Sequence, residues 1–211
     1  KPKLRILDAF AGSGVVSRYM KRHASLLVSN DFEDYAAVIG RCFLKNKSAM
    51  DLRVSGAIDF LNAIVADASM DVGFIERLYA PNDDANIQPG ERVFYCKQNA
   101  RRLDNYRRLL EGLPAPVRDS IMGPLLSKAS VHNNTSGVFK GFHKNPQTGI
   151  GQFGGGGVDA LSRILGEIRL EPPVLSEFEC NVDVRQDDAN ALPGRVRHLD
   201  LVYLDPPYNQ H

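Results

Sequence analysis

Two short runs of residues, one near each end of the 211-residue chain, carry side chains that could hold a small molecule. The first is DAFAGSG at residues 8–14, whose glycines let the backbone turn closely around a ligand and lead into a helix. The second is DPPY at residues 205–208, where a carboxylate, a stiff proline pair and an aromatic ring follow one another. Tyr208 could stack on a planar ring while Asp205 and the carbonyl of Pro206 accept both hydrogens of an amino group. The second run therefore predicts a site for a flat molecule that carries an amino group.

The elements that must position these runs are the strands of an α/β sheet. Four apolar segments predict strands, at residues 4–8, 25–29, 178–185 and 199–204. Helical patterns follow the first two, and this alternation indicates a doubly wound parallel sheet. Because such sheets bind ligands at the carboxyl ends of their strands, both runs are expected at one edge of the sheet. Asp31, directly after the second strand, is placed to accept ribose hydroxyls, although a plain surface acid is an equally good interpretation.

The long segment between the early and late strands is predicted to be mostly helical and basic at its centre. Residues 91–145 carry ten basic and four acidic side chains, whereas residues 31–90 carry five basic and ten acidic ones. A basic middle between acidic flanks suits a phosphate-facing surface, and a solvated helix face explains it about as well. Residues 131–157 are rich in glycine, asparagine and aromatic side chains and show no helical period.

Together, these runs resemble the two signature motifs of S-adenosylmethionine-dependent methyltransferases that modify the amino group of adenine in DNA. The order of a glycine motif, a large insertion and then DPPY is that of the Dam-like class. A third segment, residues 134–146, is similar to the Asn-Gly-Phe-Gly-Lys-Pro segment in the DNA-contacting part of Dam-like enzymes. The resemblance implies a Rossmann-like methyltransferase sheet, S-adenosylmethionine as the cofactor and double-stranded DNA as the partner.

The resemblance also implies roles for individual residues. The cofactor would be bound by residues of the first motif and two further acids: Asp8, Phe10, Ala11, Gly12, Ser13, Gly14, Asp31 and Asp188. Asp188 would meet the adenine amino group of the cofactor, with Asp187 as the alternative. The target base would be held by the late motif: Asp205, Pro206, Pro207 and Tyr208. DNA would be contacted by basic and amide side chains of the middle segment: Arg101, Arg102, Arg107, Arg108, Asn133, Asn134, Lys140 and Lys144.

We accordingly divide the chain into three parts. Residues 1–53 form the cofactor-binding half of the catalytic sheet, residues 54–170 an inserted helical target-recognition region, and residues 171–211 the remaining strands with DPPY. The predicted activity is methylation of adenine in DNA, within a restriction-modification system, and a cognate endonuclease is a possible partner. Both ends of the chain look cut, so we expect a piece of a longer protein, and this leaves the activity of the piece itself in question.

Several alternatives stay open. The same chemistry could act on cytosine, on RNA or on a protein glutamine, although an acid at position 205 favours adenine in DNA. The chain could also be a non-catalytic DNA-binding fragment or specificity subunit. A nicotinamide dehydrogenase is disfavoured because Ser17 stands where the dinucleotide fingerprint has its third glycine.

The remaining sequence features predict a cytoplasmic protein that forms a monomer or a weak dimer. Three scattered cysteines are too few for a disulfide framework or a zinc site, so we expect packing thiols and no metal. No apolar run approaches the roughly 20 residues that a membrane helix needs. No basic and apolar leader opens the sequence, so secretion is not expected.

Overall fold

The computed structural model describes residues 2–66, 70–135, 141–155 and 158–207. Its residues group into two compact units. The first unit comprises Lys1–Val54, Ala115–Gly123 and Pro172–His211, and the second comprises Ser55–Pro114 and Pro124–Glu171. The functional division at residues 53/54 and 170/171 stays a prediction, and each unit is described by itself below.

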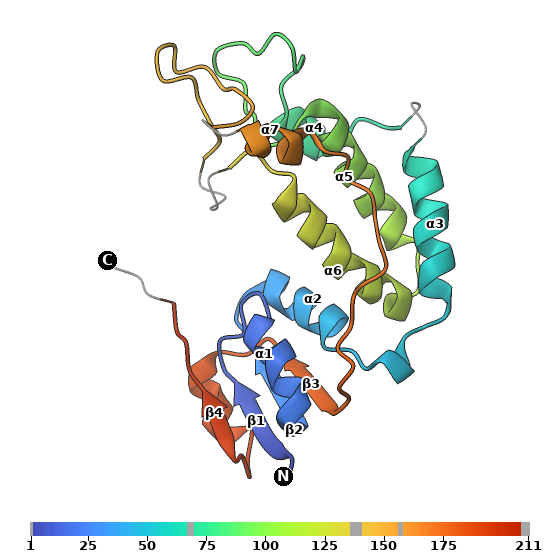
Figure 1. Cartoon of the computed structure of the whole chain (residues 1–211), viewed down its shortest axis with the longest axis vertical. Coiled ribbons are helices and arrows are strands. Elements are labelled where there is room, and N and C mark those ends of the chain that lie inside the picture. Colours follow the sequence, from blue (N-terminus) through green and yellow to red (C-terminus); the bar gives the residue numbers. More distant parts are fainter. Residues whose placement is uncertain (1, 67–69, 136–140, 156–157, 208–211) are drawn as a thin grey trace. The chain divides into compact units, whose positions relative to one another are not determined.

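The first unit is built on a parallel sheet of four strands. They are β1 (Leu4–Asp8), β2 (Ala24–Asn30), β3 (Asn181–Arg185) and β4 (Leu201–Tyr203), in the order β3-β2-β1-β4. Figure 1 shows the early strands, in blue, lying between the late ones in orange and red. All three strand pairings are parallel, so the prediction of an α/β fold with a parallel sheet is confirmed. The late strands are shorter than the 178–185 and 199–204 segments predicted for them.

The strand order produces a reversal at β1. From β1 the chain adds β2 and then β3 on one side, whereas β4 pairs with the other side of β1. In the register, Ile6 lies opposite both Leu27 and Leu201. A crevice for ligands is typical of the carboxyl ends of strands at such a switch point.

Both faces of the central strands are buried, which explains why these strands read as continuous apolar runs. Ile6 and Leu27 pack in one cluster with Leu44, and each is no more than 1% exposed. Leu7 and Val28, which point the opposite way, pack in a second cluster with Leu192. The alternation of side chains along each strand supplies one layer of core on either side.

The helices are divided between the units. The first unit contains α1 (Val15–Met20), η1 (Lys21–His23), α2 (Asp34–Phe43), η2 (Lys47–Ala49) and η3 (Ala189–Gly194). The second contains nearly all of α3 (Arg53–Val65), with α4 (Phe74–Tyr79), α5 (Lys97–Glu111) and α7 (Val158–Leu165). The long helix α6 (Ala115–Val131) contributes to both units, which divide between Gly123 and Pro124. The first part of the segment predicted to be mostly helical thus contains two helices, α3 and α4. Within the described ranges, every helix is too short or too polar to span a bilayer.

Lys21 is a fully buried lysine that closes the end of α2. Its Nζ donates to the carbonyl oxygens of Leu44 and Lys45, at 2.7 and 3.2 Å, and to Oδ1 of Asn46 at 2.9 Å. The last carbonyls of a helix have no partner within the helix, and a cation there also complements the helix dipole. Burial lowers the pKa of Lys21, and the nearby Glu179 and Cys180 oppose this effect. Lys21 thus ties α1 and η1 to the segment that follows α2.

We predict that Lys21→Met lowers the free energy of unfolding. Methionine fills the same space but leaves the buried carbonyls without a donor, which costs about 1–3 kcal/mol. Urea denaturation of the variant and the unmodified protein measures this difference. Lys3→Met is the matched control, because Lys3 is exposed and its loss should change stability by no more than about 0.5 kcal/mol. Equal effects of the two substitutions would contradict a structural role for the Lys21 ammonium group.

Candidate functional site

A pocket of about 350 Å³ lies in the first unit at the carboxyl ends of the strands. It brings together residues that are far apart in the sequence: Ala9, Phe10, Gly12, Asn30, Asp31, Phe32, Glu33, Tyr35, Asp187, Ala189, Asp205 and Pro207. Its volume falls at the lower end of the range of about 300–1,000 Å³ that is usual for ligand pockets. The glycine turn, the acid after β2 and the start of DPPY therefore share one cavity.

The glycine turn after β1 is fixed to the end of β2 by its backbone. Gly12 and Gly14 have φ angles of 52° and 73°, in the left-handed region that glycine adopts without strain. The amide of Ala11 donates to the carbonyl of Asn30 at 2.8 Å. The amide of Gly12 donates to Oδ2 of Asp31 at 2.7 Å. Because that amide already has a carboxylate partner, it is poorly placed to hold a phosphate.

Asp31 is held by two backbone amides. In addition to Gly12, the amide of Glu33 donates to its other carboxylate oxygen, Oδ1, at 2.9 Å. The two contacts leave lone pairs on each oxygen and orient the carboxylate beside the pocket. Paired hydroxyl donors, as on a ribose, match such a fixed and partly exposed acceptor.

Asp8 lies beneath the glycine turn and is fully buried. Ser17 donates to its Oδ2 at 2.7 Å and also contacts the hydroxyl of Ser29 at 2.9 Å. Burial raises the pKa of Asp8, the Ser17 hydrogen bond partly offsets this, and the charges of Asp31 and Asp205 add to it. Oδ1 of Asp8 has no hydrogen-bond partner among the described residues. Asp8 does not line the pocket, and its hydrogen bond from Ser17 joins the end of β1 to α1.

The acids after β3 have different surroundings. Asp187 lines the pocket, and its Oδ1 accepts from Arg195 at 2.5 Å. Asp188 is instead the N-cap of η3, where its Oδ1 accepts from the backbone and side-chain nitrogens of Asn190 at 2.9 and 3.0 Å. The structure thus brings the alternative residue, and not Asp188, to the cavity. The sequence pattern of two adjacent acids contains no signal that separates them.

Two residues of the DPPY motif, Asp205 and Pro207, reach the pocket. Pro206 is exposed and does not line it, and Tyr208 lies outside the described residues. Of the first motif, Ala9, Phe10 and Gly12 line the cavity, whereas Ala11, Ser13 and Gly14 do not. Gly14 begins α1 as its N-cap.

The described lining of the pocket is acidic. Four of its side chains are carboxylates, those of Asp31, Glu33, Asp187 and Asp205, and none of its described lining residues is basic. Arg195 balances only Asp187. Acids grouped in this way favour a ligand with positive charge and disfavour a phosphorylated one.

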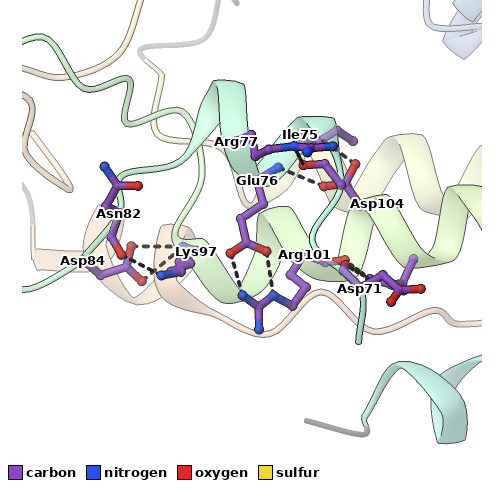
Figure 2. A network of polar contacts seen from close by, with 11 residues as sticks. Asp71, Ile75, Glu76, Arg77, Asn82, Asp84, Lys97, Arg101 and Asp104 are labelled. Carbon is purple, nitrogen blue, oxygen red and sulfur yellow. Dashed lines mark hydrogen bonds and ion pairs between the residues drawn. The ribbon is translucent and has the colours of Figure 1, made fainter. Parts of the chain in front are cut away.

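The predicted DNA-contacting arginines of α5 form ion pairs inside the second unit. Figure 2 shows the guanidinium group of Arg101 facing the carboxylate of Glu76, with both contacts at 2.6 Å. Glu76 is only 5% exposed, so this pair is largely shielded from water. Arg102 is buried and pairs with Glu167 at 2.8 Å. These pairs argue against a direct phosphate contact from either arginine.

The next two arginines are more accessible. Arg107 pairs with Glu111 at 3.7 Å and lies 5.1 Å from the ring centre of Phe74. Arg108 pairs with Asp71 at 3.3 Å. Both side chains are more than half exposed, so an incoming phosphate could compete for them.

The predicted DNA-contacting residues that follow α6 also differ in whether they are buried or exposed. Asn134 is fully buried: its amide nitrogen donates to the carbonyls of Val93 and Gln152, and its Oδ1 accepts from Gly154. Asn133 is also buried and accepts from Thr135. Lys144 is exposed at the base of a tight hairpin, where it pairs with Gly151 in an antiparallel bridge. Lys140 lies outside the described residues.

Within the described part of the chain, no group of three or more His, Cys, Asp or Glu side chains could hold a metal ion. Cys42 and Cys96 are buried, and burial raises the pKa of Cys42 to about 12. A thiol with so high a pKa is a poor nucleophile at neutral pH.

The chain is similar to two proteins named as Type II methyltransferases. It is 26% identical to the Type II methyltransferase M.NlaIII of Neisseria lactamica over 208 residues, which are 96% of this chain and 55% of the relative. It is 24% identical to the Type II methyltransferase M.CviAII of Paramecium bursaria Chlorella virus 1 over 209 residues, 97% of this chain and 56% of the relative. The chain thus spans about half the length of these relatives.

No family model and no solved structure matches the chain. The similarity to the two relatives nevertheless covers almost the whole chain and supports a methyltransferase. The parallel four-stranded sheet with its crevice at the strand ends fits a Rossmann-like methyltransferase fold.

Proposed function

We propose that this chain is the cofactor- and base-binding part of a DNA methyltransferase that acts on the exocyclic amino group of adenine, with S-adenosylmethionine as the methyl donor. The observation that carries the proposal is the single pocket that joins Gly12, Asp31 and Asp205 at the switch point of the sheet. Both relatives are Type II methyltransferases, so we place the activity in a restriction-modification system. A cognate endonuclease, a cytoplasmic location and a monomeric or weakly dimeric state remain predictions.

The chemistry of the pocket fits the proposed cofactor. S-adenosylmethionine carries a sulfonium and an ammonium group, and the lining contributes four carboxylates. Its ribose diol suits Asp31, whose two oxygens are fixed by backbone amides. Its adenine amino group suits Asp187. A dinucleotide, by contrast, would bring its pyrophosphate to a turn where Asp31 already occupies the Gly12 amide.

The target base would be held by the DPPY motif. The amino nitrogen of adenine is a weak nucleophile because its lone pair is delocalised into the ring. Hydrogen bonds from this amino group to the carboxylate of Asp205 and the carbonyl of Pro206 would favour a more tetrahedral nitrogen, with its lone pair available for attack. When bound, the cofactor would supply an electrophilic methyl group to this nitrogen, with the electron pair of the carbon–sulfur bond left on sulfur, and the methylated nitrogen would release one proton to solvent. The protein contributes placement and electrostatics, and no covalent enzyme intermediate is required.

Access to the amino group requires that the adenine leave the base stack, so the protein must also hold the surrounding duplex. We assign this role to the second unit. Lys144 is its best-placed candidate among the described residues, because it is exposed, whereas Arg101 and Arg102 are engaged with Glu76 and Glu167. To contact DNA, Arg107 and Arg108 would have to break their ion pairs with Glu111 and Asp71 and pair with a phosphate instead.

We predict that Asp205→Ala lowers kcat by about 100- to 1,000-fold, because the variant no longer polarises the amino group in the transition state. DNA affinity should change little, because phosphate contacts dominate binding. The assay measures transfer of a labelled methyl group from S-adenosylmethionine to duplex DNA with the full-length protein. Digestion of the product and chromatography then distinguish N6-methyladenine from N4-methylcytosine.

Asp119→Ala is the control for this experiment, because Asp119 lies on α6 away from the pocket lining. It should retain full activity. Parallel losses of DNA binding and activity in Asp205→Ala would contradict the assigned role. Calorimetry without any heat from S-adenosylmethionine in the unmodified protein would favour a non-catalytic binding module.

We also predict that Lys144→Ala reduces the salt dependence of DNA binding. The slope of log K against log salt should fall by about 0.9, which corresponds to one lost phosphate contact. Fluorescence anisotropy at several salt concentrations measures this slope. Lys128→Ala is the control, because Lys128 is paired with Glu171 within the second unit and should leave the slope unchanged. An unchanged slope for Lys144→Ala would remove this residue from the interface.

A further inference from the structure

We propose that Asn30 is a positioning residue: its buried side chain fixes Asp187 beside the pocket and thereby sets the preference for an adenine amino group on the cofactor. The inference rests on the proposed function, because it assumes that the pocket holds the adenosine part of S-adenosylmethionine. Asn30 itself need not touch the adenine to have this effect.

The contacts of Asn30 join three strand ends. It is the last residue of β2, the central strand between β1 and β3, and is only 1% exposed. Its Nδ2 donates to the carbonyl of Ala9, after β1, and to the carbonyl of Asp187, after β3, both at 3.1 Å. Its Oδ1 accepts from the backbone amide of Asp187 at 2.9 Å. One carboxamide therefore holds both backbone polar groups of Asp187 and links them to the glycine turn.

Only asparagine has the required groups at this length. Two carbonyls need two donors, and the amide of Asp187 needs an acceptor, so a flipped carboxamide would place its oxygen against two carbonyl oxygens. Aspartate is the same shape but has no donor when ionised. Leucine would bury all three backbone groups without partners.

Fixing the backbone of Asp187 also determines where its carboxylate lies. The clamp uses only the main chain of this residue and leaves the side chain to the pocket, where Arg195 engages Oδ1. The next acid, Asp188, turns to Asn190. A small rotation of the backbone after β3 would withdraw Asp187 from the cavity, and Asn30 opposes this rotation.

The test compares two ligands that differ at one position of the purine. S-adenosylhomocysteine has an amino group that can donate to a carboxylate, whereas S-inosylhomocysteine has a carbonyl in its place. The unmodified, full-length protein should bind the adenosine compound about 10- to 100-fold more tightly, the range expected for a hydrogen bond to a charged group. In Asn30→Asp this ratio should fall towards one, measured by calorimetry below the unfolding temperature.

Asn62→Asp is a matched control in the second unit. Asn62 also clamps a single residue, since it donates to the carbonyl of Leu170 and accepts from its amide, both at 3.0 Å. This variant should lose stability and keep the ligand ratio. Asp187→Asn, which leaves the clamp on the backbone intact, should lose the ratio as Asn30→Asp does. If Asn30→Asp does not fold, Asn30→Ser is measured instead, with the same expected loss of the ratio.

The outcomes separate this inference from the proposed function. A protein that binds neither ligand contradicts the proposed function. A ratio that persists in the folded Asn30 variant overturns the inference and leaves the function standing. The same holds if both affinities fall by an equal factor, since that result shows a purely structural role. A ratio that is unchanged in Asp187→Asn overturns the inference whatever the Asn30 variants do.

Discussion

Where each parallel strand ends, the next backbone N–H and C=O groups no longer form hydrogen bonds within the sheet. Each of these groups needs another hydrogen-bond partner at the turn that follows. At the carboxyl edge of the sheet in the first unit, the buried carboxamide of Asn30 forms hydrogen bonds with backbone groups of the segments that follow β1 and β3. Since buried backbone groups without partners are costly, this single side chain constrains how the glycine turn and the acid after β3 are arranged. The second unit uses the same device at Asn62, Asn99 and Asn134, each of which bonds to backbone groups distant in sequence.

The fixed strand ends allow four acids to be grouped around one pocket. The carboxylate of Asp31 accepts hydrogen bonds from two backbone amides, and the carboxylate of Asp187 forms an ion pair with Arg195. Asp8 shows the cost of the arrangement, because burial raises its pKa and the nearby charges of Asp31 and Asp205 add to the effect. A cationic ligand would relieve part of this repulsion when it binds. The acidic lining therefore favours a cationic ligand over a pyrophosphate. The absence of the third glycine of the dinucleotide fingerprint, where Ser17 stands, favours the same choice.

The strands and the pocket could be predicted from sequence because the signals are local and the topology is constrained. Apolar runs such as residues 4–8 predict buried parallel strands, and such strands carry ligands at their carboxyl ends. The choice between Asp187 and Asp188 could not be predicted, because it depends on which carboxylate caps η3. Asn30 was missed for a related reason. An asparagine followed by an acid is typical of an ordinary turn, and the hydrogen-bond partners of Asn30 lie 21 and 157 residues away along the chain.

Charge in the second unit shows a further limit of sequence reasoning. A run of arginines predicts a phosphate-binding surface only if the side chains lack acidic partners, and those partners are remote: Arg101 meets Glu76 and Arg102 meets Glu167. The Arg101 pair lies within a larger network, in which Asp104 accepts from the first amides of α4 and so fixes the helix that carries Glu76 (Figure 2). Breaking it to bind a phosphate would leave a buried carboxylate uncompensated, and the attraction to DNA would have to exceed that cost. Exposed lysines such as Lys144 face no such cost. Under the proposed DNA-binding role, a count of basic residues would therefore overestimate the number of phosphate contacts. The salt dependence of binding should reflect only the cations that are not paired with a buried acid.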